Sequence, residues 1–465
     1  MSKARAYSLD ALRGYAIVTM VLSATVAGGI LPGWMYHAQL PPPSNLFDPQ
    51  IPGITWVDLV FPFFLFAMGA AFPFSLGAKL DKGVSPFRLV YDSLLRGLKL
   101  CFFAIFIQHM YPYVISSPQD MRAWLITLTA FVLLFPMFMR MPWKMKRRWE
   151  ILIEFSAYAL ATVMMLCVHY AGDRTFSLYF SNIIILILAN MAVFGSIVYI
   201  FTYKNRWARV GVLPFLMAVY LSGNIEGSWT AVLLNYSPVP WFFQFGFLRY
   251  LFILLPASVA GEYLKQWLSS GRDTIIGANR YSFRILVICL ALIVCNLYCL
   301  YVRNLFTNVW ISAILILSLY YLTAGKDRNS GYWRKLTTIG GYLLFLGLFF
   351  EAYEGGIHKD PATYSYYFVT TGLGCITLIV FSVICDVYRW KVVCRPFELA
   401  GENPMIAYVA CSMLIEPLLS ICGVYSVFMN MNGNVLEGVL RGVILTTLAL
   451  LTAIFFSKIK WYWRT

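Results

Sequence analysis

The sequence predicts an all-α, polytopic integral membrane protein with about 14 transmembrane helices (about 12–14). Its 465 residues are 60% hydrophobic and only 12% charged, and this charged share is about half that of a soluble protein. Apolar stretches of roughly 20 residues, long enough to cross a bilayer, recur along the whole chain. A water-soluble globule is excluded, because too few charged side chains remain to cover its surface.

Each apolar stretch is expected to form one transmembrane helix, and short charged or proline-containing segments separate the stretches. Membrane lipid is therefore an expected partner of most of the surface. We place the spans at residues 12–30, 54–76, 95–115, 123–141, 151–170, 178–201, 210–222, 245–267, 283–302, 309–324, 338–353, 367–387, 404–422 and 436–459.

The basic residues fall on alternate connecting segments, and this bias predicts the orientation. If the N-terminus is cytoplasmic, the cytoplasmic segments carry all but six of the 36 lysines and arginines. The six on the outer side are Arg122, Arg174, Arg249, Arg303, Lys359 and Arg441. We therefore expect both termini in the cytoplasm and a multi-pass protein of the inner (cytoplasmic) membrane. The net charge of +15 then reflects this bias, and no nucleic acid is expected as a partner.

No linker or repeat divides the chain, so residues 1–465 are expected to form a single transmembrane domain. Its longest outer loops are residues 31–53, 223–244, 354–366 and 423–435, where chemistry is expected because loops over a rigid scaffold carry function. Phosphate-loop, dinucleotide-binding, serine-hydrolase and zinc-protease motifs are absent from the sequence. The ten cysteines lie in or near the spans without CxxC spacing, so neither a disulfide framework nor a metal site is expected.

His37 in the first outer loop is the first candidate for chemistry. It is followed by three consecutive prolines, which stiffen the loop and lower the entropy of holding a side chain in place. Asp58 lies at the outer mouth of the second span, where a carboxylate needs a partner or water. Asp58 or Asp48 would orient the imidazole for general-base chemistry. The alternatives are a rigid surface cap at His37 and a helix N-cap or interhelical hydrogen bond at Asp58.

Several segments resemble the heparan-α-glucosaminide N-acetyltransferase family of transmembrane acyltransferases, whose bacterial relatives are linked to amino-sugar use. They are residues 5–14, His37-Ala38, 58–62, 357–359 with 367–373, and 401–408. The resemblance implies transfer of an acyl group, in the first instance acetyl, from cytoplasmic acyl-CoA (acetyl-CoA) to an amino sugar or other glycan acceptor on the periplasmic side. It also implies a catalytic histidine at His37 and suggests a homodimer.

This chain departs from the family pattern in two places. About eleven additional residues, 41–51, separate His37 from the Asp-Leu-Val-Phe-Pro run. Ala24 and Thr25 stand where the family has an asparagine near the outer end of the first helix. If that asparagine holds the acyl carbonyl, this protein must use another donor.

Other polar residues suit such a reaction. His37 would take a proton from the nucleophile or accept the acyl group, and Asn403 and Thr371 would donate hydrogen bonds to the oxyanion. Residues expected to bind the sugar are Glu226, Trp229 and Trp241 in the 223–244 loop, and Glu354, His358 and Lys359 as a polar cluster. Arg5 and Arg13 would hold the phosphates of acyl-CoA, although the positive-inside bias also explains them.

Two other functions fit the same residues. A polar cluster at an outer helix end also suits an inner-membrane transporter of an amino sugar or cell-wall sugar, of the N-acetylglucosamine or N-acetylmuramic acid type. Against transport, the sequence has no internal symmetry and no matched pair of broken helices. A catalytically silent scaffold with an acyltransferase fold is the third reading.

Overall fold

The backbone is helical throughout its membrane-embedded part, as required where lipid offers no hydrogen bonds. The computed structural model describes residues 6–139, 146–269 and 280–464, and these ranges contain helices and no strand. The prediction of an all-α protein is confirmed.

Fourteen helical segments correspond to the predicted spans. They are α1 (Tyr7–Thr25), α2 (Trp56–Phe72), α4 (Pro86–His109), α6 (Met121–Phe138), α7 (Arg147–Cys167), α8 (Ile183–Asn190) with α9 (Ser196–Phe201), α10 (Arg206–Ser222), α12 (Leu251–Ser269), α13 (Ser282–Tyr301), α14 (Leu305–Leu322), α15 (Arg328–Glu354), α16 (Tyr364–Phe381), α18 (Pro404–Ala410) with α19 (Glu416–Ile421), and α21 (Val435–Lys458).

Short elements connect or extend these helices. The π-helical turns are Pro73–Gly77, leading from α2 into α3 (Ala78–Leu80), Met191–Gly195, Ser382–Val387 and Cys411–Ile415. The remaining elements are the 3-10 helices Gly33–Met35 and Phe245–Tyr250, and the short helices α5 (Pro112–Ile115), α11 (Thr230–Leu234), α17 (Lys391–Glu402) and α20 (Tyr425–Met429).

Eleven of the described helices are long and apolar enough to cross a membrane by themselves, which makes the chain a multi-pass membrane protein. The three predicted spans outside this set correspond to α1, α4 and α10. Helices α1 and α4 include charged residues such as Asp10 and Arg96, and α10 has only 17 residues. The total of fourteen spans and the cytoplasmic termini stay predictions.

Several predicted boundaries are wrong; α15, for example, begins at Arg328 and not at residue 338. Helix α1 begins and ends five residues before the predicted span 12–30, because the chain turns to extended backbone at Val26. Helix α4 begins at Pro86 and ends at His109, whereas the predicted span is 95–115. The first half of α4 is polar, so hydropathy does not mark it as part of a span, although the proline at the first helical position starts the helix there. Pro112 then begins the separate helix α5.

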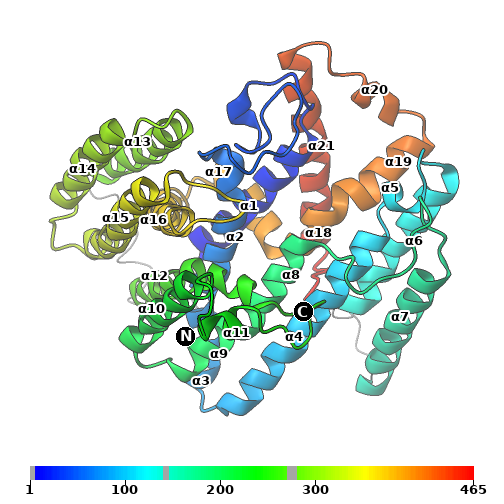
Figure 1. Ribbon diagram of the computed structural model, residues 1–465, viewed down its shortest axis with the longest axis horizontal. Coiled ribbons are helices and arrows are strands. Elements are labelled where there is room, and N and C mark those ends of the chain that lie inside the picture. Colours follow the sequence, from blue (N-terminus) through cyan, green and yellow to red (C-terminus); the bar gives the residue numbers. More distant parts are fainter. Residues whose placement is uncertain (1–5, 140–145, 270–279, 465) are drawn as a thin grey trace.

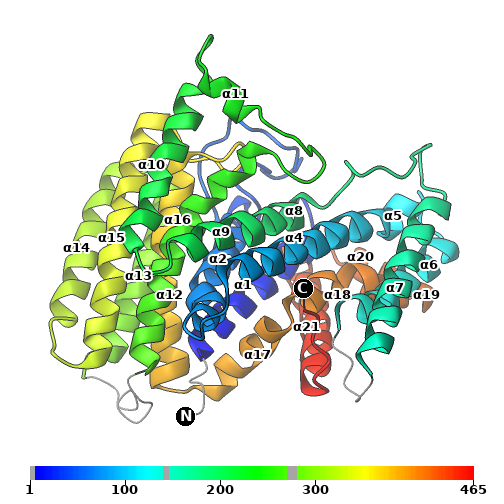
Figure 2. The ribbon, with the colours of Figure 1, turned by 90° about the horizontal axis from the view of Figure 1, so that it is seen from below.

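The helices form two groups that differ in tilt. In Figure 2, α10 and α12 to α16 stand side by side, while α4 and the α8–α9 segment run obliquely across the bundle. Seen along the shortest axis, α1 and α2 lie at the centre between these groups (Figure 1). The loops before α2 and before α16 lie at the edge that carries α11, and α17 lies at the opposite edge (Figure 2).

Helices α1 and α17 approach so closely that only glycine fits at the contact. A Cβ atom on Gly14 would lie 1.8 Å from the carbonyl oxygen of Phe397, and one on Gly401 would lie 2.0 Å from that of Asp10. Small residues at helix contacts allow this approach inside membranes. The contact anchors the N-terminal half of α1 to the amphipathic helix α17.

Candidate functional site

The start of α2 fixes the first carboxylate of the site. Thr55 caps the helix by accepting from the backbone N–H of Val57, and Asp58 Oδ2 accepts from the backbone N–H of Thr55 at 2.9 Å. A carboxylate in the first turn also interacts favourably with the helix dipole. The Asp58 side chain is fully buried, and its other oxygen, Oδ1, faces the first outer loop. Asp58 is thus both the helix cap and a partner of His37.

His37 lies between two carboxylates. Its Nδ1 is 3.3 Å from Asp58 Oδ1, and its Nε2 is 3.5 Å from Asp360 Oδ2. The backbone N–H of Gln39 also points at Nδ1, at 3.1 Å. The side chain is only 11% exposed, so the ring does not point into bulk solvent. An imidazole that takes a proton here becomes a cation with a carboxylate at each nitrogen, which is the arrangement of a stabilised general base.

Gln39 brings the second carboxylate to His37. This buried side chain donates to the backbone carbonyl of Asp360 at 2.7 Å and accepts from the backbone N–H of Asp360 at 2.9 Å. A further backbone bond, from Gly53 N–H to the Ile357 carbonyl at 2.8 Å, joins the same two loops. The loop between α15 and α16 is thereby held against the first outer loop.

Asp360 was not among the residues that the sequence singled out. A hydrogen bond from His37, and the nearby Lys359 ammonium, hold the pKa of its carboxyl below the usual value although burial acts in the opposite direction. Lys359 Nζ also lies 3.8 Å from Asp58 Oδ1. Lys359 neutralises part of the charge of the two carboxylates, and its predicted binding of substrate stays a prediction. No local signal marks Asp360, because its partners are some 320 residues away in sequence.

Asp48 is not a partner of His37 in the structure. Its backbone N–H donates to the Gln39 carbonyl at 2.9 Å, and its Oδ1 accepts from the backbone N–H of Gln50 at 2.9 Å. This is a local turn of the kind that Asp side chains stabilise. The expectation that Asp48 orients the imidazole is corrected: Asp48 shapes the loop that carries His37.

Asn403 and Thr371 are placed where neither serves an oxyanion beside His37. The amide of Asn403 donates to the Trp461 carbonyl at 2.7 Å and accepts from the Trp463 N–H at 3.2 Å, which fixes the C-terminal segment. Thr371 lies inside α16, buried, and its hydroxyl donates to the Tyr367 carbonyl at 2.6 Å. Both side chains satisfy backbone groups, as buried polar groups generally must.

Two residues of the predicted polar cluster have structural partners. Both oxygens of Glu354 accept from backbone N–H groups at the start of α16, those of Tyr364 and Ser365, at 2.8 and 2.9 Å. His358 Nδ1 lies 3.1 Å from the Gly356 carbonyl within its own loop. Glu354 and His358 therefore support the loop that carries Asp360.

The aromatic and acidic residues of the 223–244 loop do not gather at His37. Glu226 and Trp229 are exposed, and Trp229 keeps 74% of its surface accessible. Trp241 packs against Phe242. None of these three is among the described residues that line the cavity next to Asp360, so the proposed sugar contacts of Glu226, Trp229 and Trp241 stay predictions.

That outer cavity has a volume of about 250 Å³ and lies between the ends of α10, α12, α15 and α16. Pro361, Ala362 and Thr363, which directly follow Asp360, form one wall. Its polar residues include Arg249, Asn224 and Tyr220. Through Pro361, the residue after Asp360, this cavity adjoins the His37 site.

A second cavity, of about 500 Å³, lies at the other end of α1 and α2. Arg13, Asp10 and Lys265 line it together with apolar residues of α2 and α12. Arg13 was predicted to bind acyl-CoA, and its place in this cavity keeps that prediction open. Arg5 lies outside the described residues.

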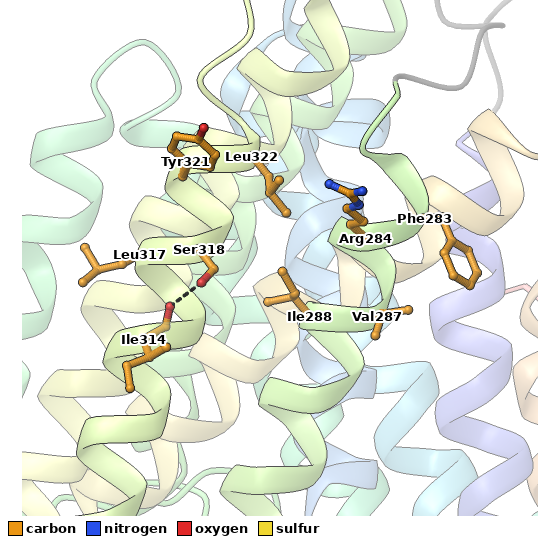
Figure 3. A pocket seen from close by; sticks show the side chains of 9 residues that line it. All are labelled: Phe283, Arg284, Val287, Ile288, Ile314, Leu317, Ser318, Tyr321 and Leu322. Atoms are coloured by element: carbon orange, nitrogen blue, oxygen red, sulfur yellow. Dashed lines mark hydrogen bonds between the residues drawn. The ribbon is translucent and has the colours of Figure 1, made fainter.

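A larger cavity, of about 770 Å³, lies far from this chemistry between α13 and α14 (Figure 3). Most of its walls are apolar side chains, but Arg284 also lines it, and the Ser318 hydroxyl donates to the Ile314 carbonyl of its own helix at 2.8 Å. Several lining residues, Leu317 and Tyr321 among them, are exposed.

Among the described residues, the side chains that could hold a metal ion are Cys385, Cys394 and Glu398, whose ligand atoms lie within 4.8 Å of one another. All three are buried, at the junction of α16 and α17. The search for CxxC spacing missed them because eight residues separate the two cysteines. They are remote from His37 in the fold and take no part in its chemistry.

Comparison with known proteins gives a single family match. The model of a family described as a domain of unknown function (DUF5009) matches residues 5–264, more than half of the chain. This range includes His37 and Asp58 but ends before Lys359 and Asp360. No curated protein matches the chain.

Proposed function

The chain belongs to the DUF5009 family, whose description names no activity, and from the geometry of the site we propose that it is a membrane-bound acyltransferase. It moves an acyl group, acetyl in the first instance, from cytoplasmic acyl-CoA to an amino sugar or other glycan acceptor on the periplasmic side of the inner membrane. The observation that carries the proposal is the imidazole of His37, held 3.3 Å from the buried Asp58 and 3.5 Å from Asp360.

The reaction uses His37 as the general base. The acceptor nitrogen or oxygen attacks the thioester carbonyl, a new C–N or C–O bond forms, and the C–S bond breaks. His37 takes the proton of the nucleophile and gives it to the departing thiolate. Asp58 holds Nδ1 and stabilises the imidazolium, a contribution typically worth 10²–10⁴-fold in rate, roughly, for a positioned base. Asp360 faces Nε2, the other nitrogen of the ring.

The inner cavity supports the donor side of the proposal. Its cationic groups, Arg13 and Lys265, suit phosphate groups. From Asp58 to Ala71, which lines this cavity, α2 spans about 20 Å at 1.5 Å per residue. An acyl-CoA bound there must extend its thioester along α1 and α2 to reach His37.

The test is an acyl-transfer assay on the purified full-length protein. Radiolabelled acetyl-CoA and amino sugars are incubated with wild type, His37→Ala and Asp58→Asn. We expect labelled sugar from wild type, none from His37→Ala, and a rate lower by roughly 10²-fold or more for Asp58→Asn.

Matched controls come from the same face of the molecule. His169→Ala removes an exposed outer histidine, and Asp48→Asn removes the loop carboxylate that does not touch His37. Both should stay near wild-type activity. Full activity of His37→Ala, or equal losses in Asp48→Asn and Asp58→Asn, would contradict the proposed base.

If the protein is a transporter, the same purified protein should move the sugar without acylating it. Uptake of unmodified amino sugar into proteoliposomes, without acylated product in any assay, would replace the acyltransferase proposal with a carrier. Uptake that depends on Asp58 and Asp360 would then assign the carboxylate pair to cation or amine binding.

A further inference from the structure

The guanidinium of Arg249 is a free cation in the wall of the outer cavity. It lies 4.5 Å from the centroid of the Tyr220 ring, and among the described residues no carboxylate forms an ion pair with it. The other outer arginine near this site, Arg303, is paired with the buried Glu351 at 3.0 Å. An arginine held over an aromatic ring without a carboxylate is available for an anionic ligand.

The cavity also presents the opposite charge close by. Asp360, 54% exposed, directly precedes the wall formed by Pro361, Ala362 and Thr363. The Tyr250 hydroxyl interacts electrostatically with both Arg249 and Asp360. A ligand in this cavity therefore meets the Arg249 cation, and the carboxylate that faces His37 belongs to the residue directly before the cavity wall.

We infer that the acceptor is zwitterionic, an amino sugar that also carries a carboxylate or phosphate group. Arg249 binds the acid group in a charge-assisted pair, and Tyr220 and Tyr364 offer aromatic surface to the sugar ring. The ammonium group is drawn to Asp360, releases one proton to the solvent, and reaches His37 as the amine that attacks the thioester. This inference rests on the proposed function and specifies its acceptor.

The size of the cavity agrees with a small ligand. A volume of about 250 Å³ is close to the lower end of the range for small-molecule sites, roughly 300 Å³. Glu354 also lines the cavity, and both its oxygens accept from backbone N–H groups at the α16 N-terminus, which holds this carboxylate at the helix end and weakens its repulsion of an acid.

The experiment measures binding, so that it does not depend on turnover. Purified full-length protein in phosphatidylcholine nanodiscs is titrated calorimetrically with glucosamine, muramic acid and glucosamine 6-phosphate. We expect the two zwitterions to bind roughly tenfold tighter or better than glucosamine, the usual gain from a hydrogen bond to a charged group. Arg249→Gln should abolish this preference and Arg249→Lys should keep part of it.

The control is Arg174→Gln, because Arg174 also lies on the outer side over an aromatic ring, that of Phe180 at 5.2 Å, but does not line the cavity. Equal affinities for glucosamine and muramic acid in wild type, or a preference that survives Arg249→Gln, would overturn the inference. Loss of muramic acid binding when phosphatidylglycerol is added to the nanodiscs would assign Arg249 to a lipid phosphate instead, and would also overturn it.

The two proposals fail separately. Arg249-dependent binding of zwitterionic sugars without acetyl transfer refutes the acyltransferase and leaves the ligand class standing. Acetylation of neutral amino sugars with unchanged KM in Arg249→Gln refutes the ligand class and leaves the acyltransferase standing.

Discussion

At the scale of single residues, the site depends on one carboxylate that does two things. Asp58 Oδ2 accepts from the backbone N–H groups of Thr55 and Ala38, at 2.9 and 3.2 Å, and Oδ1 faces His37 and Lys359. A buried carboxylate is costly unless it is paired and hydrogen-bonded. Here the pairing that makes its burial tolerable also positions the imidazole, so the helix cap and the orientation of His37 cannot be separated.

Asp360 gives a prediction about pH. His37 and Lys359 lower the pKa of its carboxyl in the folded protein, relative to about 3.9 in an unfolded chain. A lowered folded-state pKa means that this contribution to stability is present above the unfolded value and is lost as the pH falls through the folded value. The stability advantage of wild type over Asp360→Asn should therefore shrink as the pH is lowered from about 6 to about 3.

Thermal unfolding of the two proteins in detergent measures this difference. Because Asp360 is 54% exposed and screened by solvent, the difference in Tm at pH 6 should be small, on the order of 1–2 °C. Asp173→Asn, in an exposed outer loop, is the matched control and should show no such change with pH. A difference that grows on acidification would contradict the assigned ion pairing.

At the scale of elements, the position of α1 is set by contacts that its own sequence does not reveal. Gly14 and Gly401 bring α1 and α17 together, and Arg13 Nη1 donates to the Gly401 carbonyl at 3.2 Å across the same contact. Arg13 and Asp10 then face the inner cavity. The close glycine contact therefore shapes the cavity proposed for acyl-CoA.

Gly401→Ala tests this contact. The new Cβ would meet the Asp10 carbonyl oxygen at 2.0 Å, and backbone atoms cannot yield as a flexible side chain does. We expect a loss of stability of about 1–3 kcal/mol, typical of overpacking, and a higher KM for acyl-CoA. Heating followed by size-exclusion chromatography measures the stability of the detergent-solubilised protein.

The control for this variant is Gly211→Ala in α10, where no atom lies within 4 Å of the added Cβ. Its stability should equal or slightly exceed that of wild type, because alanine favours a helix more than glycine does. Unfolding of both variants at the same temperature would show that the α1–α17 contact tolerates a side chain.

At the scale of the whole molecule, the orientation in the membrane decides which cavity meets which substrate. From the positive-inside bias we expect the inner cavity with Arg13 to face the cytoplasm and the His37 site to face the periplasm. Figure 2 shows the loops of the His37 site and helix α17 at opposite edges of the molecule. A donor from one side and an acceptor from the other fit this separation.

Cysteine labelling in intact cells tests the orientation. Cys167 and Cys422 are exposed at helix ends on the predicted outer side, so a membrane-impermeant maleimide should label Cys422 in a Cys167→Ser protein. Labelling should disappear in the Cys167→Ser/Cys422→Ser double variant. Lys82→Cys, introduced into that double variant on an exposed inner loop, should react only after the membrane is opened. Labelling of Lys82→Cys in sealed cells would reverse the topology.

The sequence by itself determined the helical class and the membrane-embedded character. Hydropathy is a local property, because each apolar stretch must satisfy its backbone and bury its side chains in lipid wherever it packs. It also singled out His37 and Asp58, which are close in sequence and flank one loop. The boundaries of α1 and α4 were misplaced because hydropathy marks neither a helix that begins with polar turns, as α4 does, nor the change to extended backbone that ends α1 at Val26.

Only the tertiary structure decided what surrounds His37. Asp360 and Gln39 meet although 321 positions separate them, and the Asn403 amide is occupied by backbone groups of Trp461 and Trp463, 58 and 60 positions away. Hydrogen bonds between distant loops leave no periodic pattern in a sequence. Helix formation depends on neighbours along the chain, whereas a constellation of charges depends on which loops the packed helices bring to the same edge.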